Sequence, residues 1–367
     1  MIEVDDLIKT LKKNKINFFS GVPDSILKNL SIYLQKNESK KHVLAVNEGA
    51  AVSIGIGHYL STKQVPCIYL QNSGLSNAIN PLISIAHQNV YSIPLVLIIG
   101  WRGSPGIKDE PQHEVKGKIT LDLLKLLGIE YTIIRNDSDL NNFNKAIKKS
   151  KKKKTIIAGL IEKNILTNKN FVSKKEGYYK LDKDVFYLNF LKNIKSKDLL
   201  ISSTGYNSRE LFFYRKKYKL NKGKDFYMVG GMGHTSSLSL GININKKNNR
   251  VICLDGDGSF IMHMGALITL ANSGNPNLKY VLINNNLHDS VGGQTTYVNK
   301  IDIKKLVISL GFKNYFLIKN DTNIKNKIKN FLNSKSLSFL EVRTSINKVK
   351  NLPRPKNLKN IKDRFLK

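Results

Sequence analysis

The chain has 367 residues, enough to bury a sizeable core and to form two domains. It has no apolar run of membrane-spanning length, and its acidic beginning (Glu3, Asp5, Asp6) lacks a signal peptide's layout. This argues against a membrane or secreted protein and predicts a cytoplasmic location. Its two cysteines, Cys67 and Cys253, lie inside apolar runs rather than at metal-ligand spacing, so we expect both to be inert core residues.

The formal net charge is +33. Clustered positive charge is typical of nucleic-acid-binding proteins, because it releases counterions from phosphates. Here the lysines are spread along the whole chain among asparagines and isoleucines, and no basic region alternates with stacking aromatics. We therefore interpret them as solvated surface, with a basic nucleic-acid-binding protein as the non-enzyme alternative. An electropositive surface would also attract a dianionic substrate.

Strands and helices are expected to alternate along residues 1–161. Apolar runs of strand length, each followed by small polar residues or glycine, span residues 16–19, 43–46, 67–70, 94–99, 130–134 and 155–160. Helices are expected at 4–14, 26–34 and 121–127 and before the lysine run at 148–154. This alternation predicts a doubly wound, mostly parallel α/β sheet.

Periodicity fades at 162–184, where lysine, asparagine and glycine dominate, so we interpret this stretch as a linker. A second α/β domain is expected from 185 to 367. Its strands are expected at 199–203, 226–229, 251–254, 280–283, 315–318 and 338–342, and its helices at 236–241, 304–310 and 323–332. The lysine-rich end from residue 348 predicts a surface or disordered tail.

Two neighbouring strands of the second domain are followed by oxygen-bearing side chains. Asp257 follows one strand and Asn285 the next. An open parallel sheet binds ligands just outside the carboxyl ends of its strands, so both residues can converge on one hard cation. Gly256 and Gly258 let backbone N–H groups approach a phosphate closely. The pattern predicts a magnesium-diphosphate clamp.

Two acids of the first domain follow strands in the same way. Asp24 could simply cap the next helix, but a carboxylate at that edge also faces the cleft formed by strand-end loops. Glu48 begins a helix that is nearly free of charge, where an ordinary capping or helix-dipole interaction is the alternative to a functional role.

The loop after the fourth strand carries further candidates. His113 is expected in a long loop containing proline and glycine, where catalytic groups concentrate. Arg102 suits a tetrahedral oxyanion because its planar fork donates two parallel hydrogen bonds. Its alternative role is a salt bridge with Asp109 or Glu110.

Three separated segments resemble the cofactor-binding segments of thiamine diphosphate enzymes. The Gly-Asp-Gly turn at 256–258 is followed, beyond one helix and one strand, by asparagines at 284–285. The Asn-Glu-Gly-Ala-Ala segment at 47–51 is similar to the one that carries their aminopyrimidine-binding acid, and the glycine turn at 231–233 is the third. Together they resemble the thiamine diphosphate-dependent 2-oxo acid decarboxylase family.

Residues 101–113 and 288–295 are most similar to the phosphonopyruvate decarboxylase branch. That resemblance implies decarboxylation of 3-phosphonopyruvate to phosphonoacetaldehyde and CO2 in phosphonate biosynthesis, with thiamine diphosphate and Mg²⁺ as cofactors. The nearest alternative is sulfopyruvate or another small 2-oxo acid, because sulfonate and phosphonate are similar anions. A cofactor-binding but inactive partner protein is a further alternative.

The resemblance also implies an architecture. A pyrimidine-binding domain (1–161) and a diphosphate-binding domain (185–367) follow each other with no middle domain. In this family the two halves of each site come from different subunits, so a homodimer or higher homo-oligomer is implied. No membrane and no specific nucleic acid is expected as a partner.

Single residues receive roles from the same resemblance. The metal ligands would be Asp257, Asn285 and the backbone carbonyl of Leu287. The cofactor would be bound by Glu48, Gly231, Met232, Gly256, Asp257, Gly258, Ser259 and Asn285. The catalytic residues would be Glu48, Asp24, His113 and His288, and Arg102 would bind the substrate.

The chemistry of three of these roles is specific. Glu48 would hydrogen-bond the aminopyrimidine ring of the cofactor. Met232 would be the apolar wedge that bends the cofactor, with a core methionine as the alternative. Ser259 would help hold the diphosphate at a helix N-terminus.

Overall fold

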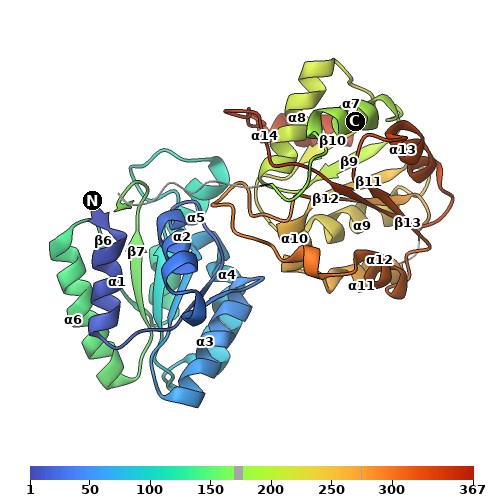
Figure 1. Ribbon diagram of the computed structural model, residues 1–367. Helices are drawn as coiled ribbons and strands as arrows, with labels where there is room; N and C mark the ends of the chain where they lie inside the picture. Colours follow the sequence, from blue (N-terminus) through green and yellow to red (C-terminus); the bar gives the residue numbers. More distant parts are fainter. Residues whose placement is uncertain (169–176, 274) are drawn as a thin grey trace. The chain divides into compact units, whose positions relative to one another are not determined.

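A computed structural model describes residues 1–168, 177–273 and 275–367. The chain divides into two compact units, Met1–Lys174 and Lys175–Lys367 (Figure 1). The 21 or so residues between the last strand of the first sheet and the first helix of the second unit are too few for a middle domain, since domains have at least about 50 residues. The precise limits of the two domains stay a prediction.

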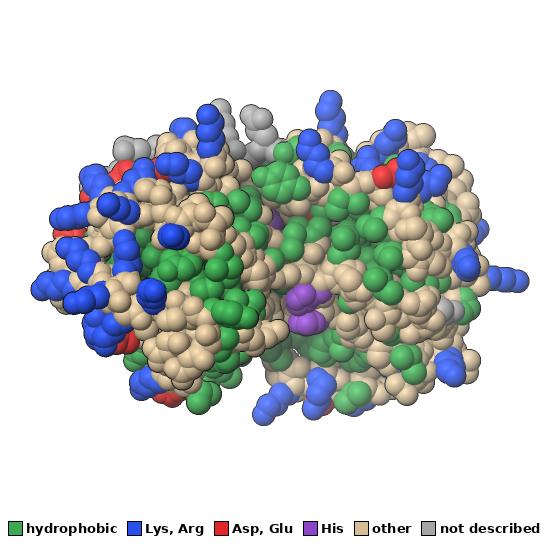
Figure 2. All heavy atoms as spheres, turned by 90° about the horizontal axis from the view of Figure 1, so that it is seen from below, with side chains coloured by type: hydrophobic (Ala, Val, Ile, Leu, Met, Phe, Trp, Pro, Cys, Tyr) green, Lys and Arg blue, Asp and Glu red, His purple; other side chains and the backbone are tan. Residues whose placement is uncertain are grey.

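Basic side chains project from many separate places on both units in the face that Figure 2 shows. On that face they form several groups rather than one basic patch, which agrees with the spread of lysines along the sequence. Among the described residues, none of the helices has the length and apolar character that crossing a membrane requires.

The first unit is built on a six-stranded sheet in the order β3-β2-β4-β5-β7-β6, with every neighbouring pair parallel. Its strands are β2 (Phe19–Gly21), β3 (His42–Leu44), β4 (Cys67–Gln71), β5 (Val96–Gly100), β6 (Glu130–Ile134) and β7 (Ile157–Ile161). β4 and β5 lie in the middle, and their residues are almost all buried because helices cover both faces of the sheet.

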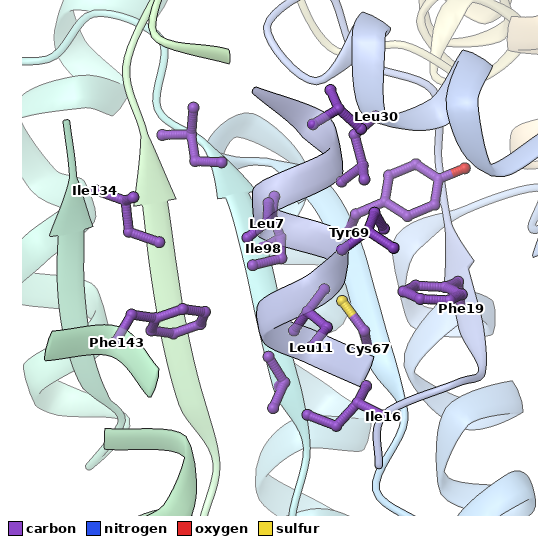
Figure 3. Close-up of a cluster of buried hydrophobic side chains, with 14 of the residues drawn as sticks. Leu7, Leu11, Ile16, Phe19, Leu30, Cys67, Tyr69, Ile98, Ile134 and Phe143 are labelled. Carbon is purple, nitrogen blue, oxygen red and sulfur yellow. The ribbon is translucent and has the colours of Figure 1, made fainter. Parts of the chain in front are cut away.

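The helices of this unit cover the two faces in two groups. One face carries α1 (Val4–Lys13), α2 (Lys28–Asn37) and α6 (Asp137–Lys153), and the other carries α3 (Glu48–Thr62), α4 (Leu75–Pro81) and α5 (Pro111–Leu126). In α1 the apolar residues recur at three- and four-residue spacing, so Leu7 and Leu11 both point at the sheet. Figure 3 shows them packed beside Ile98 of β5, with Cys67 of β4 close by.

The second unit has its own six-stranded parallel sheet, in the order β10-β9-β11-β12-β14-β13. Its strands are β9 (Leu199–Ser202), β10 (Lys224–Tyr227), β11 (Val251–Gly256), β12 (Leu278–Asn284), β13 (Asn314–Ile318) and β14 (Ser338–Arg343). Two doubly wound parallel α/β sheets were predicted, and this is confirmed. Cys67 and Cys253 are free and buried in β4 and β11.

Helices again lie on both faces of the second sheet. One core contains residues of α7 (Lys183–Lys192), α8 (Tyr206–Tyr218) and α13 (Ile324–Asn333). The other contains residues of α9 (Thr235–Asn245), α10 (Asp257–Met262), α11 (Ala266–Asn272), α12 (Ile303–Ser309) and α14 (Leu358–Leu366). α9 and α10 both begin at the carboxyl edge of the sheet, directly after the glycine-rich turns.

Several expected boundaries were wrong. The strand expected at 16–19 is β2, which begins only at Phe19, and the stretch expected to be a linker contains β8 (Leu166–Thr167), paired in parallel with β1 (Ile2–Glu3). Part of the tail expected from residue 348 forms α14, which is largely at the surface as one of the two expectations had it, although Ile361 is buried and Phe365 packs edge-on against Phe226. Leu358, Ile361 and Phe365 recur at helical spacing, a signal that the surrounding lysines obscured.

The largest difference concerns the loop after β5. α5 begins at Pro111, about ten residues earlier than expected, so His113 lies in the first turn of a helix and not in a loop. Proline is favoured at the first position of a helix because its missing N–H has no intrahelical partner there. Only residues 101–110 connect β5 to α5.

Candidate active site

The carboxyl edge of the second sheet brings together Asp257 and the loop that begins with Asn284, Asn285 and Asn286, here called the asparagine loop. β11 and β12 pair in parallel with Gly256 opposite Ile283, so the residues that follow each strand leave the sheet side by side. Asp257 is buried, and its carboxylate accepts hydrogen bonds from the Gly258 N–H at 2.9 Å and the Thr296 hydroxyl at 3.1 Å. Burial raises the pKa of Asp257 to about 7, although those hydrogen bonds act to lower it.

The asparagine loop is held by its own side chains. Asn284 Oδ1 accepts from the N–H of Asn286, and Asn285 Oδ1 accepts from the N–H of Leu287, each at 3.0 Å. Asn286 adopts a left-handed backbone conformation (φ 60°), which asparagine tolerates better than most residues. Thr296 donates its N–H to the Asn286 carbonyl at 3.1 Å and its hydroxyl to Asp257, so it ties the two halves of the site together.

This arrangement fits a magnesium ion. A carboxylate, an amide side chain and a backbone carbonyl are hard oxygen donors, the set that Mg²⁺ prefers. Burial disfavours the charge of Asp257, and a bound cation would reverse that cost. Within residues 1–168, 177–273 and 275–367 no group of three or more His, Cys, Asp and Glu could hold a metal.

The glycine turn before α9 lies against the start of α10. Gly231 and Gly233 both have positive φ (64° and 86°), and a Cβ on Gly233 would come within 2.6 Å of His263 Nδ1. The Gly233 N–H donates to the Ser259 hydroxyl at 3.0 Å. Ser259 therefore braces this turn in the structure, a contact that was not anticipated.

Met232, Gly258 and His288 meet at one point. A Cβ added to Gly258 would lie 3.1 Å from the Met232 methyl and 3.0 Å from His288 Nδ1. Met232 is half-buried. Burial lowers the pKa of His288 to about 4, which makes its imidazole neutral at physiological pH.

In the first unit, Asp24 lies in a hydrogen-bond network just before α2, whose N-cap is Leu27 and not Asp24. Its Oδ2 accepts from the N–H groups of Ile26 and Leu27 at 3.0 Å each, ahead of α2, and its Oδ1 accepts from the Gln71 side chain. Burial raises the pKa of Asp24 despite these donors. The Ser73 hydroxyl donates to Gln71 Oε1 at 2.5 Å, which fixes the Gln71 amide with its nitrogen toward Asp24.

Glu48 is not the cap of its helix. Asn47 takes that role by accepting from the N–H of Ala50 at 2.8 Å. The Glu48 side chain is buried instead, where Oε2 accepts from Asn77 Nδ2 at 2.8 Å and burial raises the pKa of the carboxyl group. Gly74 lies directly against it, since a Cβ there would be 2.0 Å from Glu48 Oε1.

Arg102 forms a two-pronged salt bridge with Asp109. Nε donates to Oδ2 at 2.8 Å and Nη2 to Oδ1, the first of the two salt bridges considered from the sequence. Although burial opposes ionisation, these bonds hold the pKa of Asp109 at about 2. His113, on the first turn of α5, is half-buried and close enough to Asp109 to favour its charge.

The connection between β5 and α5 is tightly packed. Trp101, the single tryptophan, is buried and donates its Nε1–H to the Gly117 carbonyl at 3.0 Å. A Cβ on Gly117 would come within 1.7 Å of the Gly103 carbonyl oxygen, so the helix lies directly on the turn. Asn72 accepts from the Arg102 N–H at 3.1 Å and thereby fixes this turn to the end of β4.

Each unit thus gathers part of the expected set at the carboxyl edge of its sheet. The first holds Asp24, Glu48, Arg102 and His113, and the second holds Met232, Asp257, Asn285 and His288. The residues that sequence reasoning missed here are Gln71, Asn77 and Thr296, which bind the expected side chains rather than stand out by type. The available signal was their position, since Gln71 ends β4, Asn77 lies on α4 shortly after it, and Thr296 follows the asparagine loop.

Comparison with known proteins agrees with both halves. Residues 3–126 match the family described as thiamine pyrophosphate enzyme, N-terminal TPP binding domain. Residues 204–342 match the corresponding C-terminal TPP binding domain. The first match contains Glu48 and the second contains Asp257 and Asn285.

Two curated relatives match most of the chain, and a third matches part of it. Phosphonopyruvate decarboxylase from Streptomyces viridochromogenes is 29% identical over 330 residues, which are 85% of this chain and 81% of the relative. Sulfopyruvate decarboxylase from Methanosarcina acetivorans is 26% identical over 363 residues, 92% of this chain and 90% of the relative. Sulfopyruvate decarboxylase subunit beta from Methanothermobacter thermautotrophicus is 35% identical over 138 residues, 38% of this chain and 71% of the relative. The chain therefore belongs to the thiamine diphosphate-dependent 2-oxo acid decarboxylase family.

Proposed function

We propose that the protein decarboxylates 3-phosphonopyruvate to phosphonoacetaldehyde and CO2 in phosphonate biosynthesis, with thiamine diphosphate and Mg²⁺. The observation that carries this is the 29% identity to a phosphonopyruvate decarboxylase across both units. Direct loss of CO2 from a 2-oxo acid leaves an electron pair on an acyl carbon. Bound thiamine diphosphate supplies the electron sink for that pair.

The second unit would hold the diphosphate end of the cofactor. Asp257, Asn285 and the Leu287 carbonyl would bind Mg²⁺, and the backbone at Gly256 and Gly258, which carries no side chain, would lie beside the phosphates. The closeness of Asp257 to the asparagine loop, through Thr296, supports this assignment. Gly231 and Met232 form the adjoining turn, which Ser259 braces from α10, and the apolar side chain of Met232 would press on the cofactor.

The first unit would hold the aminopyrimidine. A buried carboxyl with a raised pKa, such as Glu48, suits a hydrogen bond to a ring nitrogen whose proton must be shared. Asp24, His113 and His288 would handle protons at the reacting carbon, with His288 acting as a neutral imidazole. Glu48 and Asp257 belong to different units, and the resemblance implies that the two halves of each site come from different subunits. We therefore propose a homodimer or higher homo-oligomer with shared sites.

Sulfopyruvate is the second candidate substrate. The M. acetivorans sulfopyruvate decarboxylase is similar along 92% of this chain, so both units are again included. Sulfonate and phosphonate are tetrahedral anions of similar size, and one cationic site could bind either.

The test is aldehyde and CO2 formation from each acid side by side, with protein loaded with thiamine diphosphate and Mg²⁺. We expect a higher kcat/KM with 3-phosphonopyruvate. A higher value with sulfopyruvate would reassign the substrate. Uptake of the cofactor with no CO2 release from either acid would instead indicate an inactive partner protein.

A further inference from the structure

Arg102, the residue expected to bind the substrate anion, already forms an ion pair with Asp109. Asp109 accepts two hydrogen bonds from Arg102, and the side chains are only 17% and 7% exposed, so this pair is well shielded from solvent. The guanidinium has one further polar contact, from Nη1 to the Ser25 hydroxyl at 3.4 Å. An anion that replaced Asp109 on this fork would leave a buried carboxylate without its partner.

Lys116 lies at the same edge of the sheet and is not neutralised. It lies on the second turn of α5, is half-buried, and donates one hydrogen bond from Nζ to the Ser73 carbonyl at 3.0 Å. It forms no ion pair with any carboxylate of the described residues. An ammonium group has three donors, so two of them remain for a ligand.

The surroundings of Lys116 are the catalytic part of the first unit. Ser73 donates its hydroxyl to Gln71, which in turn donates to Asp24. The next residue, Gly74, lies against the Glu48 carboxylate. Lys116 is close enough to Glu48 for its charge to act on that group. The ammonium is therefore held by a backbone carbonyl near the buried Glu48.

We propose that Lys116 binds the tetrahedral oxyanion of the substrate, its phosphonate or sulfonate end, and so selects for 2-oxo acids with a second anionic group. The inference rests on the proposed function. It replaces the substrate-binding role that the sequence suggested for Arg102, which becomes a structural residue that shapes the loop. A half-buried cation held in place by a carbonyl is preorganised for an anion, because little entropy remains to be lost.

Variants of one helix test the assignment. K116M keeps the length and most of the packing of the side chain but removes its charge, whereas K116R keeps the charge. The matched control is K118M, because Lys118 lies two residues along the same helix and is exposed. For each variant loaded with thiamine diphosphate and Mg²⁺, kcat and KM are measured with 3-phosphonopyruvate, sulfopyruvate and pyruvate, which has no second anion.

We expect K116M to raise KM for the phosphonate or sulfonate substrate about 30-fold, the value of a charge-assisted hydrogen bond, with kcat changed less. Turnover of pyruvate should change less than about threefold, K116R should recover most of the loss, and K118M should match the unchanged protein. An unchanged KM in K116M overturns the proposal. So does an equal loss with pyruvate accompanied by weaker cofactor binding, because Lys116 would then act through Glu48.

A binding measurement separates this proposal from the proposed function. Calorimetric titration with phosphonoacetate needs no turnover. If the unchanged protein decarboxylates none of the acids but binds phosphonoacetate and K116M does not, the function fails and the anion site stands. If turnover is normal but K116M binds phosphonoacetate as well as the unchanged protein does, the anion site fails and the function stands.

Discussion

Asn77 donates a hydrogen bond from Nδ2 to Oε2 of Glu48 at 2.8 Å, so the one acid at the start of α3 is held by a neighbour from α4 rather than by its own helix. Glu48 is buried and its pKa is raised. A carboxyl in this setting can share a proton with a ring nitrogen, whereas an amide cannot. The position of its oxygen atoms is fixed by the contacts of α3 and α4.

The first prediction concerns that carboxyl group. Replacing Glu48 with Gln should lower kcat at least about 100-fold, the usual contribution of a proton-transferring group, while the isosteric side chain preserves the fold. N77A should have a smaller effect, because it leaves the carboxyl group in place. Steady-state kinetics and circular dichroism check both variants. Near-normal turnover in E48Q would remove Glu48 from the mechanism.

The second prediction uses the space around the same carboxylate. In G74A the new methyl group would lie 2.0 Å from Glu48 Oε1, so the carboxylate must move and kcat should fall at least about tenfold. G57A on α3 is the matched control, since nothing lies within 4 Å of its added carbon. That control should keep full activity and gain up to about 1 kcal/mol of unfolding free energy from better helix propensity. Full activity in G74A would show that the carboxylate position is not critical.

The third prediction joins Mg²⁺ to pH. The pKa of Asp257 is raised by burial from 3.8 to about 7, so without Mg²⁺ the folded protein keeps a proton that the unfolded chain loses. Its free energy of unfolding should therefore fall as pH rises from about 4 to about 7. Mg²⁺ binds the ionised carboxylate, so the stabilisation it gives should grow over the same range.

Urea unfolding at several pH values, with and without Mg²⁺, measures both effects of Asp257. D257N should lose the Mg²⁺ effect, and D302N, an equivalent change at an exposed cap of α12, should keep it. Equal stabilisation of D257N and D302N by Mg²⁺ would place the ion elsewhere.

The fourth prediction concerns the Arg102–Asp109 pair. D109N should lower the free energy of unfolding by about 1–2 kcal/mol at pH 7, because a shielded arginine loses its charged partner. Since the pKa of Asp109 is depressed to about 2, this contribution should be complete above pH 4 and disappear as pH falls toward 2. D122N, at an exposed position of α5, should change stability by less than about 0.5 kcal/mol. A pH-independent difference between D109N and the unchanged protein would contradict the pair's role.

The family and the two sheets could be predicted because the cofactor loops need particular residue types at fixed places just after the strands. A carboxylate between two glycines and an asparagine after the next strand are visible without coordinates. Helix limits were harder. The first turns of α5 carry few apolar residues, and a proline such as Pro111 occurs in loops as well as at helix starts. The beginning of α5 was therefore missed.

The supporting residues could not be predicted from the sequence. Thr296 lies 39 positions after Asp257 and Asn77 lies 29 after Glu48, and neither residue type is distinctive. In the sequence, Lys116 was one of 60 basic residues. The salt bridge that Arg102 forms with Asp109, visible only in the structure, is what distinguishes Arg102 from Lys116 as a candidate for binding an anion. Pairing between distant polar side chains depends on backbone geometry that local sequence does not specify.

The formal charge of +33 is spread along the sequence. Basic side chains project from many separate places on the face seen in Figure 2. An enzyme of this family with anionic substrates gains faster encounter from a positive surface, an effect that should weaken with added salt.

The hydrogen bond from Trp101 to Gly117 has a practical consequence. Because this indole is the protein's single one and touches the second turn of α5, its fluorescence reports on one defined junction without any label. A ligand bound by Lys116 would lie one residue along the chain from the Gly117 carbonyl that the indole contacts, so its binding should alter that emission. Anion capture could thus be followed optically, in real time, in the unmodified protein.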